Sequence, residues 1–410
     1  MQLINIGICG LGTIGYGSYG LLKNNKDEIS RRLGKLLRVS HIAIRSLKEG
    51  QDVDDIKISD DAMAVARDPE VDILLEMIGG TYLAYKLVLE AIGNGKHVVT
   101  ANKALIATHG NEIFEAARDN NVIVAYEAAV AGGIPIIKVL REGLAANKIE
   151  WLAGIINGTN NYILSKMQSK ARPFAGVLKE AQDLGYAESD PTYDIEGVDA
   201  AHKLTILSAL AFGTPLNLEK AYTEGISQIT PEDLAYADEL GYRIKHLGIS
   251  SKSEQGIDLR VHPALIADQE LIAGVDGAMN VVLVRGDASG TTLYYGAGAG
   301  AEATASAVVA DVMDVVRRMD SYDQVPALAF QHEALSDTKI LPIEEIVCAY
   351  YLRISVQNEA NAIADISAIL SDNGISIDAM IKKSTDNPSK GNDVISVIIM
   401  IHEIQEAILN

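Results

Sequence analysis

A glycine-rich turn near the N-terminus constrains the fold of this chain more than any other feature. The apolar run Leu3–Cys9 leads directly into Gly10-Leu11-Gly12-Thr13-Ile14-Gly15, after which the pattern becomes helical. A G-x-G-x-x-G sequence that closes a strand and opens a helix is typical of dinucleotide-binding folds, because its backbone N–H groups can approach a pyrophosphate. The motif therefore predicts cofactor contacts from Gly10, Gly12, Thr13, Ile14 and Gly15. A glycine turn without a ligand is the alternative.

Strands and helices are predicted to alternate through the first third of the chain. The predicted strands after the glycine turn are Leu37–Ile44, Val71–Met77, Lys96–Thr100 and Val122–Tyr126, with helices at Tyr82–Ile92 and Asn111–Asn120. This alternation indicates an α/β fold with a doubly wound parallel sheet of the Rossmann type. NAD-specific sheets place an acid at the end of the second strand, whereas an arginine suits a 2′-phosphate. Arg45 and Lys48 follow that strand here, so the sequence favours NADP, with NAD possible.

Composition and charge exclude several functional classes. The 55 acidic and 35 basic residues give a net charge of −20, which argues against nucleic acid and anionic membranes as partners. Cys9 and Cys348 are the only cysteines among 410 residues, so a disulfide framework and a thiolate metal site are both excluded. No apolar run approaches the ~18 residues of a membrane span, and the N-terminus does not resemble a signal peptide. We expect a soluble cytoplasmic protein.

The remainder of the chain predicts two further parts. Strands at Ile149–Ile156, Asp258–Val261, Val281–Asp287 and Thr291–Tyr295 indicate a mixed α+β domain. A helix near Thr304–Arg318 is expected to return to the nucleotide domain. A strand at Ala349–Val356, a helix at Ala362–Asn373 and strands at Ile375–Ile381 and Val394–Ile401 give β-α-β-β, most of a ferredoxin-like unit. The predicted domains are residues 1–134 with 301–320, then 135–300, a linker 321–347, and an incomplete unit 348–410.

The stretch Gly185–Leu207 concentrates charged residues before an apolar helix. Its five acids precede a single lysine, and they are Glu188, Asp190, Asp194, Glu196 and Asp199. Asp199 and Lys203 are four residues apart and therefore share one side of the predicted helix. A surface ion pair worth about 0.3–0.5 kcal/mol is the simplest alternative. Because the helix is otherwise almost wholly apolar, we expect Lys203 at a protein-lined site and His202 at the helix surface.

Several long motifs, in a fixed order, resemble those of the homoserine dehydrogenases. They are GLGTIG, EMIGG (76–80), HVVTANKALIA (97–107), EAAVAGGIPII (127–137), NGTNNYIL (157–164), GYAESDPTYDIEGVDAAHKL (185–204) and GAGAGAEATASAVVAD (296–311). The resemblance implies reversible, NAD(P)-dependent interconversion of L-aspartate 4-semialdehyde and L-homoserine, which belongs to threonine, methionine and isoleucine biosynthesis. No aspartokinase segment precedes these motifs, so the monofunctional form is expected. The tail resembles an ACT regulatory domain.

The resemblance also implies roles for individual residues. Lys203, Asp199 and Lys103 match catalytic positions, and Glu188 and Asp194 match acids that bind the substrate. Thr100, Lys103 and Gly300 match positions beside the cofactor. Glu127 and the backbones of Val130, Gly132 and Ile134 match a monovalent-cation site, such as one for sodium.

Three departures from the family pattern stand out. Asn160 replaces the usual threonine, and Glu302-Ala303 replaces a residue-proline pair. The ACT-like turn Asn358–Ala362 lacks the usual proline and glycine, which suggests that the tail serves assembly more than effector sensing. The family associates through strands of the second domain, and the continuously apolar Val281–Val284 fits a covered strand, so a homodimer or homotetramer is expected.

The chemistry expected of these residues is consistent with the resemblance. Hydride addition to an aldehyde leaves an alkoxide that must be stabilised and protonated, and lysine is the natural donor because the eight histidines are scattered. An aldehyde-oxidising semialdehyde dehydrogenase needs a cysteine nucleophile. Cys9 lies in the first strand and Cys348 in the tail, so that class is excluded. A non-catalytic regulator that binds NADP and an amino acid is the other alternative, but it would not need Lys103, Asp199 and Lys203 together.

Overall fold

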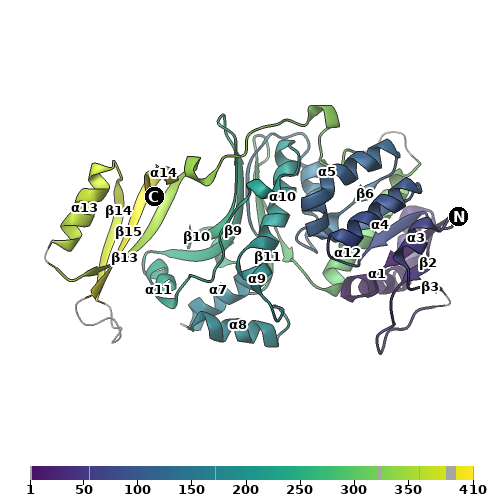
Figure 1. Cartoon of the computed structure of the whole chain (residues 1–410), viewed down its shortest axis with the longest axis horizontal. Helices are drawn as coiled ribbons and strands as arrows, with labels where there is room; N and C mark the ends of the chain where they lie inside the picture. The colour runs from purple at the N-terminus through teal and green to yellow at the C-terminus, as the bar shows by residue number, and fades with distance from the viewer. Residues whose placement is uncertain are drawn as a thin grey trace.

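The computed structural model describes residues 2–54, 56–170, 172–320, 325–359, 361–384 and 394–409. Three sheets follow one another along the longest axis of the molecule, with the N-terminal sheet near one end and the C-terminal sheet at the other (Figure 1). A parallel sheet covered by helices, a mixed sheet and a small antiparallel sheet confirm the predicted fold class.

The first sheet is parallel and has the strand order β3-β2-β1-β4-β5-β6. Its strands are β1 (Leu3–Cys9), β2 (Leu36–Ala43), β3 (Lys57–Ser59), β4 (Ile73–Glu76), β5 (His97–Thr100) and β6 (Val124–Ala125). The order reverses between β1 and β4, which is where doubly wound sheets bind their ligands. All but β3 were predicted.

Helices cover both faces of this sheet. Ile73 and Leu75 pack with α1 (Thr13–Asn24), α2 (Lys26–Leu33) and α12 (Ala301–Arg318). Leu74, between them, packs on the other face with α3 (Ala62–Arg67), α4 (Tyr82–Gly93) and α5 (Lys103–Asp119). Burial on both faces explains why the strands are continuous apolar runs. Helix α5 begins well before its predicted start because Asn102 Oδ1 accepts a hydrogen bond from Leu105 N and caps it.

The second sheet has the order β12-β11-β7-β9-β10-β8. Its strands are β7 (Ile149–Ile155), β8 (Tyr222–Thr223), β9 (Tyr242–Lys252), β10 (Ile257–Ala267), β11 (Met279–Gly286) and β12 (Gly290–Ala297). Its helices are α6 (Ile136–Lys138), α7 (Gly158–Lys170), α8 (Phe174–Asp183), α9 (Thr192–Ile195), α10 (Val198–Phe212) and α11 (Pro231–Glu239). Strand β9 was not predicted, because Lys245 and His246 interrupt its apolar pattern. Both are nevertheless buried, with 1% and 2% of their surface exposed.

The two faces of β11 are both covered within the chain. Val282 and Val284 belong to the large core that includes α10, and Val281 packs on the other side with Ile272 and Val275. The apolar run that suggested a subunit interface is therefore accounted for inside one subunit. The edge strand β12 instead exposes Leu293 and Tyr295.

The third sheet is antiparallel, with the order β13-β15-β14. Its elements are β13 (Val347–Gln357), α13 (Ala362–Asp372), β14 (Ile377–Ser384), β15 (Val394–Gln405) and α14 (Glu406–Leu409). The predicted β-α-β-β order is confirmed. Arg353 and Tyr351 of β13 both contact Asp233 of α11, at 2.8 and 3.0 Å. Ala360 of the ACT-like turn and residues 321–324 of the predicted linker lie outside the described residues.

None of the helices in the described part of the chain combines the length and the apolar character that a membrane crossing requires.

Candidate active site

Asp199, in the first turn of α10, lies at the centre of the candidate site. Its Oδ2 atom accepts hydrogen bonds from Lys203 Nζ at 2.7 Å and Asn157 Nδ2 at 2.8 Å. Its Oδ1 atom lies 3.1 Å from Lys103 Nζ. The side chains of Asp199 and Lys203 are only 6% and 12% exposed. The pair is therefore buried, and the surface-pair alternative is excluded.

Lys203 is fixed by a second acceptor besides Asp199. Its Nζ donates to the backbone oxygen of Ile156 at 2.7 Å, immediately after β7. Because an ammonium group has three hydrogens, these two acceptors set the direction of the remaining one.

Lys103 reaches Asp199 from the other side. It is the first residue of α5 and so belongs to the first sheet's helices, whereas Asp199 belongs to the helices of the second sheet. Its Nζ also lies 5.6 Å from the centre of the Tyr193 ring, within reach of a cation–π contact. The cluster thus joins the two parts of the molecule that were predicted to hold cofactor and substrate.

Asp194 is tied to the same cluster through asparagine side chains. Asn157 Nδ2 donates to Asp194 Oδ1 at 2.8 Å as well as to Asp199. Asn160 Nδ2 contacts the Asp194 backbone oxygen at 2.8 Å and His246 Nδ1 at 3.1 Å. Burial lowers the pKa of His246 to about 4, so its neutral ring accepts from Asn160 while Nε2–H donates to Glu224 O. A threonine at position 160 could not donate to both partners, because it has one hydroxyl hydrogen.

The two aspartates differ in protonation behaviour. Burial by itself raises the pKa of Asp199, but Lys203, Lys103 and Asn157 outweigh it and hold that pKa well below its ordinary value. Burial raises the pKa of Asp194, and the neighbouring charge of Asp199 adds to the rise, although the hydrogen bond from Asn157 and the two lysines act in the opposite direction. Asp199 is therefore a permanent anion, whereas Asp194 is the more easily protonated of the two.

Sequence reasoning missed Asn157, Tyr193 and His246, and it misplaced His202. His202 is buried rather than at the helix surface, since Tyr193 folds over it. The Tyr193 hydroxyl and His202 Nδ1 lie 2.9 Å apart, and burial raises the pKa of the tyrosine and lowers that of the histidine. The N-G-T-N-N motif was the available signal for Asn157. Tyr193 and His246 carried none, because only the fold brings them near Asp199.

Glu188 is not part of the hydrogen-bonded cluster. It is exposed, and its backbone oxygen accepts a hydrogen bond from Gln182 Nε2 at 3.0 Å. Its predicted role as a substrate ligand stays a prediction.

The glycine turn between β1 and α1 has the geometry that a dinucleotide requires. Gly10 has a φ of +95°, and a Cβ on Gly15 would lie 2.0 Å from Gly10 O, so neither position tolerates a side chain. A Cβ on Gly12 would meet nothing within 4 Å, so the backbone there faces open space. Thr13 and Ile14 begin α1, whose N-terminus points at that space.

The basic residues expected to select the nucleotide lie on a loop attached to this turn. Arg45 and Lys48 are exposed just beyond β2. Gln51 holds the loop, because its Oε1 accepts from Lys48 N at 3.0 Å and its Nε2 donates to Leu11 O at 2.8 Å. These two contacts tie the Lys48 end of the loop to the glycine turn.

Thr100 uses its side chain inside the protein. Its hydroxyl donates to buried Glu76 at 2.6 Å, and the other oxygen of Glu76 accepts from Ile78 N and Gly79 N. Asn102, two residues after Thr100, donates through its side-chain amide to Gly80 O at 2.6 Å. Glu76, which sequence reasoning did not single out, therefore shapes the loops after β4 and β5. A cofactor could contact Thr100 through its backbone.

The predicted cation loop has an unusual backbone and a buried acid. Ala131 and Gly132 have φ values of +55° and +43°. Glu127 accepts the backbone N–H groups of Ile137 and Lys138, both at 2.9 Å, one on each carboxylate oxygen. Within the described ranges no group of three or more His, Cys, Asp or Glu side chains could hold a metal. Gly300 has a φ of +123° and is the N-cap residue immediately before α12.

Comparisons with known proteins decide the family. A family model described as homoserine dehydrogenase matches residues 135–313, and one described as homoserine dehydrogenase, NAD binding domain, matches residues 10–127. The chain is 56% identical to a homoserine dehydrogenase of Pseudomonas aeruginosa, covering 100% of this chain and 94% of the relative. It is 52% identical to a homoserine dehydrogenase of Neisseria gonorrhoeae, covering 99% of this chain and 93% of the relative.

The chain belongs to the homoserine dehydrogenase family.

Solved structures of homoserine dehydrogenases agree with this assignment. That of Thiobacillus denitrificans superposes with a TM-score of 0.94 at 57% identity, covering 100% of this chain and 94% of the other. A hyperthermophilic archaeal homoserine dehydrogenase in complex with NADPH gives a TM-score of 0.65 at 25% identity, covering 79% of this chain and 100% of the other. The protein is therefore an oxidoreductase with an NAD-binding Rossmann domain, and the regulator alternative is not favoured.

Proposed function

We propose that the Asp199 cluster is the catalytic centre at which L-aspartate 4-semialdehyde and L-homoserine are interconverted. The observation that carries this proposal is a single buried carboxylate contacted by two lysines that come from the cofactor side and the substrate side. A structural ion pair needs one cation. A second lysine, drawn from another domain into the same site, is explained by a reacting oxygen that both can approach.

The nicotinamide cofactor supplies the hydride in the reducing direction and accepts it in the other. Lys203 donates a proton to the oxygen of the aldehyde as charge develops there, and takes it back from homoserine in reverse. Asp199 and Ile156 O fix the direction of its ammonium group. Lys103 stabilises the same developing charge from the cofactor side. Asp199 remains ionised throughout because of its lowered pKa.

The amino-acid end of the substrate requires carboxylates for its ammonium group. Asp194 lies beside Asp199 and is held by Asn157, so it is the first partner we assign. Glu188, exposed at the edge of the same segment, is the second. Glu188→Gln is expected to raise the KM for homoserine with little change in kcat, because it leaves Asp199 and both lysines in place.

NADP is the proposed cofactor, with NAD as a weaker alternative. Two observations support this choice: Arg45 and Lys48 are exposed just beyond β2, and Gln51 fastens their loop to the glycine turn. Arg45→Ala should weaken NADPH binding about ten-fold or more and leave NADH binding nearly unchanged, as charge-assisted hydrogen bonds of this kind contribute about 1.5–3 kcal/mol. Titration of intrinsic fluorescence with each nucleotide would measure both. Equal losses would rule out recognition of the 2′-phosphate by Arg45.

Three further assignments belong to this proposal. Residues 1–134 with 301–320 form the nucleotide domain, 135–300 the substrate domain and 348–410 an ACT-like unit.

Carbonyls of Val130, Gly132 and Ile134, with Glu127, form a site for sodium or a similar cation. The subunits associate as a homodimer or homotetramer, and the exposed edge strand β12 is the part of the second sheet available for pairing. Sedimentation as a monomer at micromolar concentration would contradict the assembly.

The assay that tests the catalytic proposal follows NADPH absorbance with L-aspartate 4-semialdehyde as the second substrate. NADPH should be consumed in equal amount to the homoserine formed. Tight binding of both ligands without turnover would instead indicate a regulator.

A further inference from the structure

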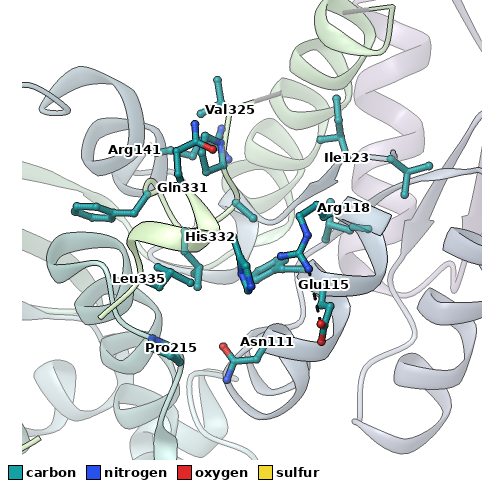
Figure 2. A pocket seen from close by; sticks show the side chains of 18 of the residues that line it. Asn111, Glu115, Arg118, Ile123, Arg141, Pro215, Val325, Gln331, His332 and Leu335 are labelled. Carbon is teal, nitrogen blue, oxygen red and sulfur yellow. Dashed lines mark ion pairs between the residues drawn. The ribbon is translucent and has the colours of Figure 1, made fainter. Parts of the chain in front are cut away.

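A cavity of about 500 Å³ lies away from the Asp199 cluster, and no step of the proposed reaction uses it (Figure 2). Its walls come from the second half of α5, from Pro215 just after α10, from the end of α12 and from the connecting segment that includes Leu328–Leu335. The cavity therefore sits where the nucleotide-binding part, the substrate part and the segment leading to the third sheet meet.

The lining combines an apolar surface with charges of both signs, and its acidic members are Glu112, Glu115 and Glu333. Phe114, Leu328 and Leu335 supply apolar wall, and Arg118, Arg141 and Arg318 supply charge. Arg318 Nη1 donates to Asp314 at 2.9 Å and Arg141 Nη2 lies 2.8 Å from Glu142, so both already have close partners.

Arg118 is paired less closely than the other two arginines. Its Nη2 atom lies 3.4 Å from Asp119 and 3.7 Å from Glu115, compared with about 2.7–2.9 Å for a strong charge-assisted hydrogen bond. The side chain is 43% exposed, and in Figure 2 it extends from α5 toward His332 across the cavity. Arg118 is thus the cation best placed to receive a carboxylate, above a wall that suits an apolar body.

The cavity also adjoins the trailing ends of the two helices that carry the catalytic lysines. Helix α5 begins at Lys103, and its Asn111 side chain makes two 3.0 Å hydrogen bonds with the backbone of Leu216, beyond the end of α10. Gly213, which ends α10, packs against the ring of Phe330, and its oxygen accepts from Ser336 N at 2.8 Å. A ligand bound in the cavity would contact α5, the C-terminal end of α10 and the connecting segment at the same time. Its binding would therefore affect the distance between Lys103 and Asp199.

We propose that this cavity is an effector site for a small amphipathic carboxylate, whose acid group binds Arg118 and whose apolar part packs on Phe114, Leu328 and Leu335. A bound ligand fixes the C-terminal ends of α5 and α10 relative to each other. It thereby changes the rate of the reaction at the N-terminal ends of these helices, where Lys103 and Asp199 lie. Differential binding to one relative placement of the helices is all that such coupling requires.

The test uses 3-phenylpropionate as the probe and its uncharged amide as the matched ligand, with binding measured by calorimetry on the full-length protein. The carboxylate should bind with a dissociation constant of about a millimolar or below, as expected for a ligand of this size. The amide should bind at least about ten-fold more weakly. The initial rate of NADPH oxidation should change by two-fold or more at saturating probe.

Two variants and a control locate the site. Arg118→Gln should remove the difference between acid and amide, and Leu335→Trp should abolish binding of both by filling the cavity. Arg31→Gln changes an exposed arginine of α2 that is paired with Glu28, and it should have no effect. Unaltered thermal unfolding would show that each variant is folded. Equal binding of acid and amide, or undiminished acid binding by Arg118→Gln, would overturn the site, and binding without a change in rate would overturn the coupling.

Discussion

Two buried aspartates show how differently the same burial can act. Asp199 and Asp311 are 4% and 1% exposed. Asp199 has ammonium groups at 2.7 and 3.1 Å, and its pKa falls below the ordinary value. Asp311 has Lys138 at 3.6 Å and accepts from Glu127 N at 2.7 Å, so burial raises its pKa to about 6. Burial and the charge of Asp311 together raise the pKa of Glu127 to about 7.

The comparison teaches that the closeness of cations, rather than depth, decides which buried acid stays charged. Coulomb energy falls with distance while the desolvation penalty is paid in full at both sites. The Asp199 site is consequently a fixed charge that can orient a proton donor. The Glu127–Asp311 site, which adjoins the other residues of the proposed cation loop, can instead exchange protons near neutral pH.

Removing a lysine from the charged site should have the largest effect. Lys203→Met keeps the length of the side chain but removes the proton donor, so kcat should fall by about 10²–10⁴-fold. NADPH affinity should change little, because the glycine turn is untouched. Steady-state kinetics in both directions, with NADPH binding by fluorescence, provide the measurement. A kcat within three-fold of the unmodified enzyme would remove Lys203 from the mechanism.

Replacing each of the two aspartates by asparagine should affect kcat to very different extents. Asp199→Asn takes away the anion that orients Lys203, and kcat should fall by about 10–10³-fold. Asp311→Asn can still accept from Glu127 N through its amide oxygen, and kcat should stay within about two-fold. Assays at saturating substrate test the pair. Comparable losses at both positions would show that the contrast between them has no functional meaning.

The smallest effect concerns stability and pH. Glu127 and Asp311 have folded pKa values of about 7 and about 6, above those of an unfolded chain. Their contribution to stability is therefore complete below about pH 4 and is lost as the pH rises through 6 and 7.

Asp311→Asn removes one titrating carboxyl group. It also removes the negative charge that contributes to the raised pKa of Glu127. Relative to the unmodified protein, its unfolding free energy should increase by about 1 kcal/mol between pH 5 and pH 7.5. Thermal unfolding at closely spaced pH values would measure this difference. Parallel stability profiles for the two proteins would mean that neither carboxyl titrates in this window.

The sequence predicted those parts of the molecule in which local pattern and position agree. The glycine turn, the parallel strands and the Asp199–Lys203 spacing are local features, and the fold matches them. Strand β9 could not be predicted, because Lys245 and His246 are polar and their burial depends on distant partners such as Asp276 and Asn160. His202 was misplaced for the same reason, since Tyr193 covers it only once α9 has packed against α10. The cavity beside Arg118 is assembled from segments that lie far apart in the sequence, and it has no sequence signal.

The central claim is that Asp199 acts on the reaction through Lys203. A double-mutant cycle on kcat with Asp199→Asn, Lys203→Met and the combined variant tests it most directly. If the aspartate works by orienting the lysine, the combined variant should be no slower than Lys203→Met alone, within about three-fold. Losses that multiply, so that the combined variant is slower by the full product of the two single effects, would contradict the account.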